Sequence, residues 1–590
     1  MASEAAAAAI HAGQRRPEGG RTALQPGVRA WMAERREALV LVVEAGLRAA
    51  RAMSTWPAAL RLMLGATPSP ALILVPQDLR TTDPVRADEI AAGVHVFAGH
   101  TVVADDPFAA EPPTPEWAEA LAGFSWLRHL RAAGTPEAAE TARRRVLAWI
   151  DAQGRSHRRN ASPLLAAERL RAWFAASGLL LAGADQVFYR RFSRALWRQV
   201  RQLELALPRL APGPDRLMAL ITLVTAGLCM EGEARLLARA SRRLAEELDR
   251  QVLADGCHVG RDPGVLVALV LDLLPLRQLF PARSATPPAA IFTAVDRMMP
   301  MIRFFQLGDG TLARFNGMGP TAIDQVATAL AYDETRGQVP GSAPHGGYER
   351  LEAGTGVVIA DVGRPPPARY SAGAHGGCLS FEFSAGREAI VINCGVPAIH
   401  RASWRREARK TAAHSTASVA NRSSVRLGRG IYSLGLVLSG PRRVEATRKG
   451  LVLEASHDGY LARDGVVHAR SLALSESGNR LDGIDRIRGA DRAWTLRFHL
   501  HPAVQLIPTE NLRAVLLRLP GGDGWRFIAD QPVGIEESVA LAFPEGPRRA
   551  LQLTVTVASS AAVPAVHWTL EKVMRPRRAA PGEAEPELPL

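Results

Sequence analysis

The chain has 590 residues, which exceeds one ordinary hydrophobic core, so we expect two or three domains. A hydrophobic share of 47% with 22% charged residues is typical of a soluble globular protein. The formal charge of +14 is carried almost entirely by arginine. It fits two interpretations, an arginine-rich proteome or a surface that binds polyanions such as acidic polysaccharide, nucleic acid or anionic lipid.

Cysteines and targeting segments give little guidance on where the protein works. The four cysteines show neither C-x-x-C spacing nor a disulfide framework, so the redox compartment stays open. No apolar run reaches the roughly 18 residues that a membrane-spanning helix needs, and we predict no membrane span. The N-terminus lacks the ordered basic, apolar and small-residue pattern of a signal peptide, so ordinary secretion is not supported.

The first half of the chain is predicted to be helical. Residues 1–25 are rich in Ala, Gly and Arg and are expected to be disordered. From 26 to 300, apolar residues recur at helical spacing between Gly and Pro breakers, apart from a short β-arm near 68–101. Paired helices with short breaks favour an α/α toroid-like domain or a helical array. No fixed-period repeat identifies a solenoid.

The second half is predicted to be a β-sandwich. From 301 to 574, alternating and β-branched segments are separated by Gly, Asp and Asn, and 311–315 is expected to be among the strands. Residues 575–590 are expected to form a flexible tail. The predicted fold class is therefore multidomain α+β, with an N-terminal α/α toroid-like helical domain followed by a C-terminal antiparallel β-sandwich.

The stretch from Tyr370 to Ser424 concentrates the polar groups of this predicted sandwich. Apolar residues alternate with polar ones over 379–384, as in a half-buried strand, and a Ser-Ala-Gly turn leads to a second strand over 389–393. His375 precedes the hairpin, Asn393 ends it, and His414 follows an arginine-rich link. Strand ends that carry His and Asn on Gly-rich loops are places where a scaffold holds a ligand or a metal.

This stretch resembles the C-terminal domain of heparinase II/III-like polysaccharide lyases. The matching positions are His375, Leu379-Ser380-Phe381, Gly395, Trp404-Arg405, and His414 with Thr416. Four positions depart from the family pattern, namely Gly373 for a His, Gly377 for an Asp, Asn393 for an Asp, and Ser415 for an Asn. The resemblance implies a zinc ion held by two His and an Asp in the sandwich, with Tyr and His or Asn of the helical domain performing β-elimination.

Carried onto this chain, the resemblance places the metal ligands at His375, Asn393 and His414. An amide oxygen is a neutral and poor zinc ligand, so Asn393 weakens the predicted zinc site. The alternative is that His375 and His414 hydrogen-bond loop backbone at a domain interface. Residues 255–266 resemble the family's catalytic helical segment, but Val265 and Leu266 stand at its Tyr and His positions.

We therefore predict His258, His375 and His414 as the catalytic candidates, with Arg261 as a carboxylate clamp. Ordinary loop roles are the alternative for His258 and for Asn316, which is predicted to face the cleft. Arg405 and Arg409, four residues apart, share a face if the link is helical, and a basic face beside His414 suits a polyanion. Asn316, Arg405 and Arg409 are thus the predicted substrate-binding residues.

The predicted function is a lyase that cleaves a uronate-containing polysaccharide by β-elimination. The alternative is a non-catalytic or altered acidic-polysaccharide-binding protein on the same scaffold, motivated by Val265, Leu266, Gly373 and Asn393. A nucleic-acid partner is not expected, because the chain has no recognisable aromatic–basic module. The resemblance suggests the cell envelope or periplasm, although a cytoplasmic location stays open. The particular sugar and the oligomeric state are not determined by the sequence.

Overall fold

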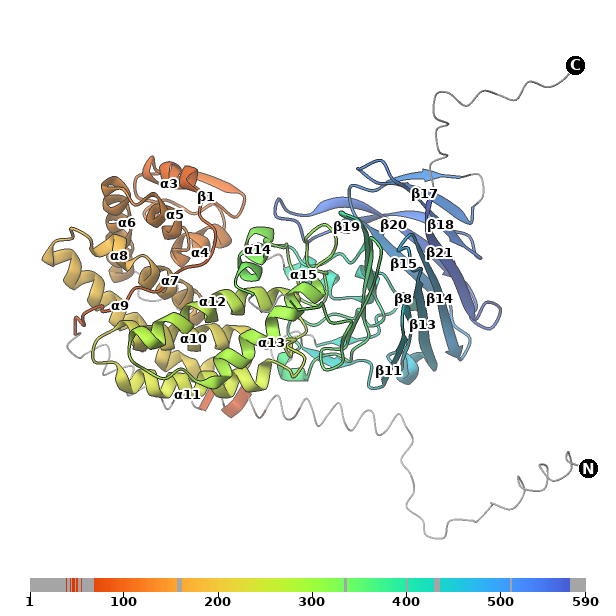
Figure 1. Cartoon of the computed structure of the whole chain (residues 1–590), viewed down its shortest axis with the longest axis horizontal. Helices are drawn as coiled ribbons and strands as arrows, with labels where there is room; N and C mark the ends of the chain where they lie inside the picture. Colours follow the sequence, from red (N-terminus) through yellow and green to blue (C-terminus); the bar gives the residue numbers. More distant parts are fainter. Residues whose placement is uncertain are drawn as a thin grey trace, which may run out of the picture.

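The computed structural model shows a helical domain joined to a β-sandwich (Figure 1). It describes residues 68–155, 162–333, 337–398, 402–428, 436–509 and 512–573, together with isolated positions between 39 and 55. The predicted disordered segment 1–25 and the predicted tail 575–590 lie outside these residues. The predicted fold class, an α/α toroid-like domain followed by an antiparallel sandwich, is confirmed.

The helical domain contains a short hairpin and a series of packed helices. The hairpin is β1 (Val94–Phe97) and β2 (His100–Val103), which lies at the C-terminal end of the predicted β-arm of 68–101. The α-helices are α3 (Pro84–Ala91), α4 (Pro115–Gly123), α5 (Leu127–Ala133), α6 (Pro136–Arg155), α7 (Pro163–Ala175), α8 (Ser177–Leu181), α9 (Gln186–Ala206), α10 (Pro214–Cys229), α11 (Ala234–Gln251), α12 (Pro263–Ala282), α13 (Ala289–Phe305) and α14 (Ile323–Ala331). The 3-10 turn η1 (Leu207–Arg209) follows α9.

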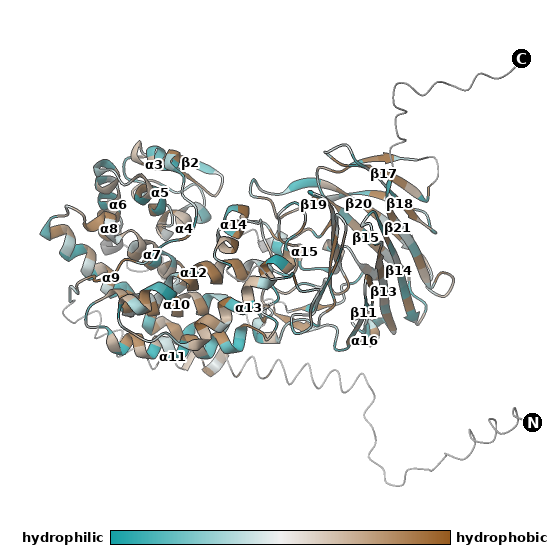
Figure 2. Cartoon of the chain, viewed as in Figure 1, coloured by the Kyte–Doolittle hydropathy of each residue, from teal (hydrophilic) through white to brown (hydrophobic). Residues whose placement is uncertain are grey.

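Local sequence explains where these helices begin and which face they bury. Ser162 and Asp262 cap α7 and α12 with their side chains, and each is followed by a proline at the first helical position. The central helix α10 packs against α7, α11 and α12, and nearly all of its residues are buried. Apolar residues accordingly run along α10 and α12, whereas polar residues alternate with them along α11 (Figure 2).

The sandwich consists of two antiparallel sheets. One has the strand order β11-β12-β13-β14-β21-β18-β17-β16, and the other β19-β20-β15-β7-β6-β5-β4-β3 with β8 added beside β15. The strands are β3 (Ser342–Ala343), β4 (Tyr348–Ala353), β5 (Gly356–Asp361), β6 (Phe381–Ala385), β7 (Glu388–Ile392), β8 (Ala417–Val419), β11 (Val444–Lys449), β12 (Val452–His457), β13 (Val466–Leu474), β14 (Arg480–Gly489), β15 (Trp494–Leu500), β16 (Gln505–Pro508), β17 (Ala514–Arg518), β18 (Gly524–Ala529), β19 (Gly534–Ala540), β20 (Arg548–Val557) and β21 (Ala565–Val573).

Smaller elements complete the sandwich domain. A separate pair, β9 (Arg426–Leu427) and β10 (Val437–Ser439), lies outside the two main sheets. The remaining helical pieces are η2 (Ala368–Tyr370), α15 (Ala402–Ala408), η3 (Thr411–Ala413) and α16 (Leu461–Asp464). Aromatic side chains fill the space between the sheets, with Phe381 stacked on Trp568 and Phe383 edge-on to Trp525.

The predicted hairpin around residues 379–393 is present as β6 and β7, but β6 is not half-buried. Its polar face is also closed, because Ser380, Glu382 and Ser384 are all 0% exposed. Glu382 accepts a hydrogen bond from the Arg314 backbone N–H at 2.9 Å, and Ser384 Oγ accepts one from Gly308 N–H at 3.0 Å. The segment that follows α13 therefore covers the outer face of this sheet, so β6 lies between two packed layers.

Three sequence-based expectations on element bounds differ from the structure. The helices continue to Ala331 and the first sandwich strand begins at Ser342, which is later than the predicted change at 300. Segments 71–75 and 311–315 form only the isolated bridges Leu72↔Met230 and Gln306↔Leu312 instead of strands.

Among the described residues, α12 alone is long and apolar enough to cross a membrane. In its most apolar stretch 67% of the residues are buried, as in the core helix of a domain.

Candidate functional site

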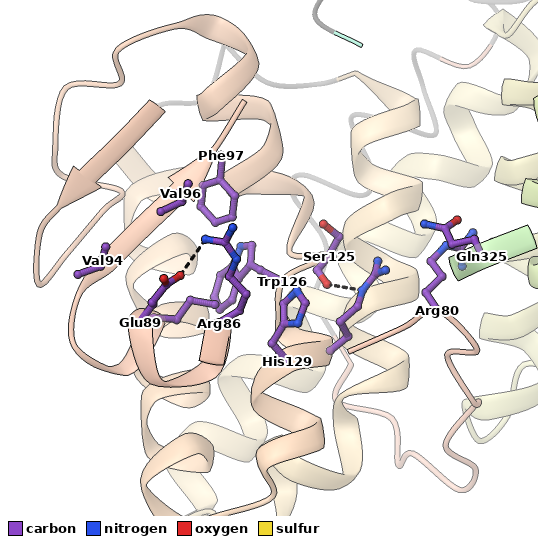
Figure 3. A pocket seen from close by; sticks show the side chains of 12 residues that line it. Arg80, Arg86, Glu89, Val94, Val96, Phe97, Ser125, Trp126, His129 and Gln325 are labelled. Atoms are coloured by element: carbon purple, nitrogen blue, oxygen red, sulfur yellow. Dashed lines mark hydrogen bonds and ion pairs between the residues drawn. The ribbon is translucent and has the colours of Figure 1, made fainter. Parts of the chain in front are cut away.

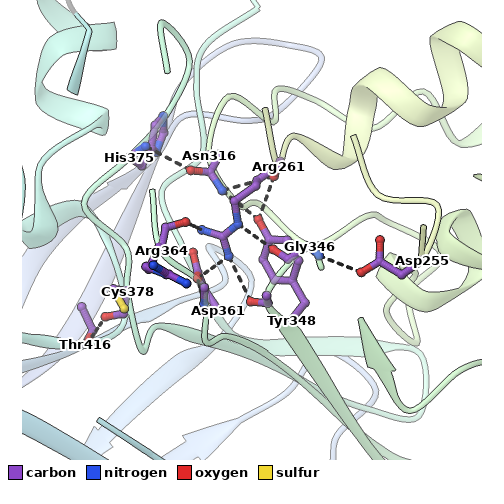
Figure 4. Close-up of polar contacts among 12 residues, drawn as sticks. Asp255, Arg261, Asn316, Gly346, Tyr348, Asp361, Arg364, His375, Cys378 and Thr416 are labelled. Carbon is purple, nitrogen blue, oxygen red and sulfur yellow. Dashed lines mark hydrogen bonds and ion pairs between the residues drawn. The ribbon is translucent and has the colours of Figure 1, made fainter. Parts of the chain in front are cut away.

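The predicted site residues gather where the start of α12 meets the loop between η2 and β6. The backbone N–H of His375, in that loop, donates to Asn316 Oδ1 at 3.1 Å, and the Asn316 amide donates to Arg261 O at 3.1 Å. Asn316 and Arg261 both have positive φ, 52° and 63°. A non-glycine residue in this region costs free energy and is held by its surroundings. The structure therefore brings the helical-domain and sandwich candidates into one hydrogen-bonded unit (Figure 4).

His375 and His414 face each other, with His375 Nδ1 3.0 Å from His414 Nε2. The other nitrogen of His414, Nδ1, is 2.8 Å from the Lys410 carbonyl oxygen and must donate to it. His414 Nε2 therefore carries a lone pair in the neutral ring, and it accepts a hydrogen bond from the Nδ1–H of His375 or faces a cation. Burial lowers the pKa of His414 to about 4, and burial together with His414 and Arg409 holds the pKa of His375 well below its ordinary value.

Asn393 is the third predicted metal ligand, and its side chain is already engaged. Its Oδ1 accepts from the Ser415 N–H at 2.9 Å, while its buried Nδ2 makes no hydrogen bond within the described residues. A β-carbon added at Gly377 would lie 2.7 Å from His414 Cδ2 and 3.2 Å from its Nε2, so a side chain here would displace the ring, and glycine supplies no anion. Two neutral imidazoles and one amide do not fit the usual ligand sets of zinc. Zinc binding stays a prediction.

Arg261 joins the two domains. Its guanidinium donates to Gly346 O at 2.6 Å, Gly347 O at 3.0 Å, Arg364 O at 3.2 Å and the Asp361 carboxylate at 2.6 Å. These bonds use four of the five N–H donors of the guanidinium. The guanidinium carbon Cζ lies 4.5 Å from the centroid of the Tyr348 ring. The structure thus gives Arg261 an interdomain role, and its predicted role as a substrate clamp remains untested.

Asn316 and His258 are similarly enclosed. Asn316 also contacts the Tyr348 hydroxyl at 2.7 Å and is 3% exposed, so it faces the domain junction and not an open surface. His258 Nδ1 accepts from the Gly260 N–H at 3.0 Å, which leaves Nε2 to donate to Gln251 Oε1 at 3.0 Å. Burial lowers the pKa of His258 to about 4. A neutral ring with both nitrogens occupied is poorly placed to remove a substrate proton.

Arg405 and Arg409 behave differently, because neither has a carboxylate partner within the described residues. Arg409 Nε donates to Ala374 O at 2.7 Å and its Nη2 donates to Ser371 O at 2.9 Å, which anchors it to the loop that carries His375. Burial lowers the pKa of Arg409 to about 10, so it stays charged at neutral pH. Arg405, on α15, has a buried Nε without a partner, and burial lowers its pKa as well. This pair is a half-buried cationic patch beside the site.

Two further positions matter here that the sequence patterns did not select. Asp262 caps α12 through Gly264 N–H at 2.9 Å, and burial raises the pKa of its carboxyl to about 6. Its Oδ2 would lie 2.8 Å from a β-carbon added at Gly317, so this oxygen points toward the site loops. The Asp-Pro pair at a helix start was the available signal, and it indicated only a cap.

Arg470 is the second such residue. It lies on β13 in the sandwich, and its Nη1 donates to Leu379 O and Ser415 O, each at 2.7 Å. It thereby supports both loops that flank His375 and His414. Arg470 is far in sequence from those loops, so no local sequence pattern indicated that it supports the site.

Comparisons with known proteins agree with this architecture. Residues 335–569 match the family described as Heparinase II/III-like, C-terminal. FtsZ-localized protein C of Caulobacter vibrioides (strain NA1000 / CB15N) is 31% identical over 530 residues, which cover 84% of this chain and 89% of that protein. The crystal structure of heparinase III has a TM-score of 0.63 at 12% identity, covering 89% of this chain and 91% of that one. Heparan sulfate lyase HepC from Pedobacter heparinus has a TM-score of 0.53 at 15% identity, covering 83% and 82%.

Proposed function

The chain belongs to the heparinase II/III-like family, and we propose that it binds an acidic polysaccharide at the domain junction without the usual elimination chemistry. The proposal corresponds to the altered, binding alternative of the sequence analysis. The observation that carries it is a cationic patch, Arg405 and Arg409, beside a site whose proton-transfer positions hold Val265, Leu266 and Gly373.

Unpaired arginines support the binding half of the proposal. A half-buried guanidinium has lost part of its hydration, and without a carboxylate partner it gains from any anion that reaches it. Within the described residues Arg409 donates only from Nε and Nη2, so its Nη1 is uncommitted there. A carboxylate or sulfate on a sugar chain offers the planar or tripodal oxygens that such a donor recognises.

Enclosed histidines support the non-eliminating half. β-Elimination needs a base at the C5 proton, an acid at the leaving oxygen and a group that neutralises the uronate carboxylate. His258, His375 and His414 are each at most 5% exposed, and burial lowers the pKa of all three. Tyr460 does not supply the missing phenol either, because it is fully buried and donates to Ala417 O at 2.8 Å.

The predicted lyase activity is the second candidate, and Asp262 favours it. A carboxyl group with its pKa raised to about 6 can accept or donate a proton near neutral pH. Tyr370, the half-buried last residue of η2, is the tyrosine nearest in sequence to the loop that carries His375. Elimination on this chain would then proceed with different groups from those that the family resemblance implies.

One preparation tests both candidates. Purified protein is incubated with heparan sulfate, chondroitin sulfate and a neutral glucan while the absorbance of unsaturated uronates is followed, and binding is measured by calorimetry. We expect binding of the acidic polymers with no absorbance rise, and Arg409→Gln should weaken binding about tenfold, as loss of one charge-assisted contact does. Arg191→Gln is the control, because Arg191 is 37% exposed on α9 and pairs with Asp151.

The outcomes separate the candidates cleanly. An absorbance rise that Asp262→Asn abolishes would establish the lyase and overturn the non-eliminating proposal. Equal binding by the Arg409→Gln and Arg191→Gln variants would mean that the cationic patch does not contribute to polysaccharide binding. Zinc content per chain, measured on the same sample, tests the zinc prediction.

We also propose that the protein works at the cell envelope, in association with FtsZ. The similarity to FtsZ-localized protein C favours this, because it extends over 84% of the chain and so includes the helical domain. Pull-down of purified FtsZ by the full chain tests the association. Failure to retain FtsZ at micromolar concentrations would contradict it, without bearing on polysaccharide binding.

A further inference from the structure

A polar pocket of about 410 Å³ lies within the helical domain (Figure 3). Its walls come from α3 and β1 on one side and from α5 at its base. The other side is formed by Arg80, which precedes α3, and by Gln325 of α14. The volume falls within the roughly 300–1,000 Å³ of small-molecule sites. None of the predicted site residues lines it, so it is separate from the site at the domain junction.

Several hydrogen-bond donors in this pocket lack an acceptor within the described residues. Arg128 uses only Nε, which donates to Ser125 O at 2.8 Å, so both terminal amino groups stay uncommitted. His129 Nδ1 accepts from the Asp83 N–H at 3.0 Å, which places the proton of the neutral ring on Nε2. The side-chain amide of Gln325 makes no hydrogen bond in this part of the structure. All three residues line the same pocket, so their donors open onto one volume.

Among the residues that line the pocket, arginines outnumber carboxylates. Arg80, Arg86 and Arg128 line it with a single carboxylate, that of Glu89. Asp78 and Asp272 contact these arginines from outside the lining, and Glu168 also acts on Arg80. Asp272 takes both Arg80 and Arg171, and Glu89 pairs with Arg86, whereas Arg128 has only a 3.5 Å contact with Asp78.

Arg128 is the lining arginine with the longest carboxylate contact. Burial lowers its pKa, and so do the neighbouring guanidinium groups, against the opposite effect of Asp78. An added anion would relieve this repulsion, and so the site favours a negatively charged ligand.

On the side of α3 and β1, apolar side chains lie beside the Arg86–Glu89 ion pair. Val94, Val96 and Phe97 of β1 line this side and are half-buried, so they present hydrophobic surface to the pocket. A sugar ring has an apolar C–H face and polar edges, and such a ring can lay its face on an aromatic or aliphatic wall while its charged substituent reaches a cation. A free inorganic anion would use only the cationic side.

We propose that this pocket is an anion subsite that binds a sulfate or carboxylate group carried on a sugar ring, with Arg128 as its main anion contact. The proposal deepens the proposed function and rests on it, because it takes the ligand to be part of an acidic polysaccharide. Arg128 would donate from both terminal amino groups, with His129 Nε2–H and the Gln325 amide completing the set.

The test uses the full chain and two small probes, sodium sulfate and sodium glucuronate, titrated by calorimetry at constant ionic strength against glucose. We expect saturable binding of at least one anion and none of glucose. Tighter binding of sulfate would identify a sulfate ester as the natural group, and tighter binding of glucuronate a uronate carboxylate. Arg128→Gln should weaken the preferred probe about tenfold or more, because it removes a charge-assisted pair of donors.

Matched variants keep the test independent of folding. Gln325→Glu puts a carboxylate into the pocket without removing an arginine, and it should also weaken binding about tenfold. Arg239→Gln, 52% exposed on α11 and paired with Glu204, makes the same charge change as Arg128→Gln and should leave binding unchanged. Thermal unfolding of each variant shows that the fold is kept.

Two results would overturn the inference, namely no saturable binding by the wild-type chain, or equal affinity in the Arg128→Gln, Gln325→Glu and Arg239→Gln variants. If sulfate binds here while heparan sulfate does not bind the chain, the subsite stands and the proposed function fails. If the polymer binds and only Arg409→Gln weakens it, the function stands and this subsite fails.

Discussion

Asp262 is a single residue in which a structural and a chemical role conflict. As the cap of α12 it needs an acceptor oxygen, which Asn supplies equally well, yet burial raises the pKa of its carboxyl to about 6. Between the unfolded pKa near 4 and the folded pKa near 6, the folded state binds more protons, so stability falls as pH rises through this window. We predict that Asp262→Asn stabilises the chain at pH 7 by about 1 kcal/mol or more.

Urea unfolding at pH 4.5 and pH 7 checks this prediction. The gain should shrink at the lower pH, where the wild-type carboxyl is protonated in the folded state. Ser162→Asn is a suitable control, because Ser162 caps α7 in the same way but carries no charge. A variant that loses stability at pH 7 would mean that the ionised carboxylate has a favourable partner in the folded state.

Residue-scale prediction from the sequence selected loops that the structure brings together, but it could not assign the roles of their residues. His258 and Arg261 were selected because they share a Gly-rich segment, and both lie at the domain junction. Their contacts, however, are Gln251 on the preceding helix and Asp361, which is 100 residues later. A histidine or arginine that is fully partnered has the same local sequence as one that is poised for catalysis, and only the tertiary contacts distinguish them.

At the scale of elements, a buried polar network holds the two site loops against the sandwich. Asp485 of β14 accepts from Arg470 Nε at 2.8 Å, from His468 Nε2 at 2.7 Å and from Trp568 Nε1 at 2.9 Å. Arg470 in turn supports the loops at Leu379 and Ser415. Truncating one member leaves an uncompensated buried charge, which costs about 3–5 kcal/mol.

We therefore predict that Arg470→Met destabilises the chain by about that amount and also weakens polysaccharide binding, because the loop that carries His375 loses its support. The double variant Arg470→Met with Asp485→Asn should recover part of the stability but not the binding. Recovery of both would show that Arg470 acts only through its charge and not through the loop carbonyls. Denaturant unfolding and calorimetry measure the two effects separately.

Strand β6 shows what a periodicity can and cannot predict. The alternation over 379–384 correctly placed the strand and its apolar face toward Trp525 and Trp568. The polar face was expected to meet water, because period-two alternation is typical of a sheet with one solvated side. Instead, Glu382 receives hydrogen bonds from Arg314 and Asn393, so its carboxylate is satisfied by protein groups. The residue pattern does not distinguish a polar face in water from one that bonds a second domain.

For the whole molecule, buried ion pairs between the halves predict cooperative unfolding. Arg261–Asp361 and Arg314–Glu382 both join the helical side to the sandwich, at 2.6 Å and 3.3 Å, and all four side chains are at most 6% exposed. We predict one unfolding transition for the wild-type chain. Arg261→Met should lower the free energy of unfolding by about 3–5 kcal/mol and separate the transition into two. Calorimetry of the variant beside Arg191→Gln checks this, and a single unshifted transition would contradict it.

Acidity acts on the whole molecule through its buried histidines. Burial lowers the pKa of His258 to about 4 and depresses those of His457 and His468, whereas the unfolded value is near 6.5. Between these values the unfolded state binds more protons, so stability is present above pH 6.5 and is lost as pH falls toward 4. Each such histidine contributes a slope of up to about 1.4 kcal/mol per pH unit. Slopes of the opposite sign come from the carboxyl groups whose pKa burial raises, namely Glu168, Asp215, Asp262, Glu349, Asp361 and Glu382.

The net prediction is that the free energy of unfolding falls between pH 6.5 and pH 5 and that the chain unfolds in mild acid. His258→Gln should reduce this fall by about one histidine's share, because glutamine can keep the hydrogen bond to Gln251 without taking up a proton. Urea unfolding at half-unit pH steps measures the slope. A flat profile in the wild-type chain would mean that these histidines are protonated in the folded state, which the closed surroundings of His258 and His468 argue against, since both are at most 2% exposed.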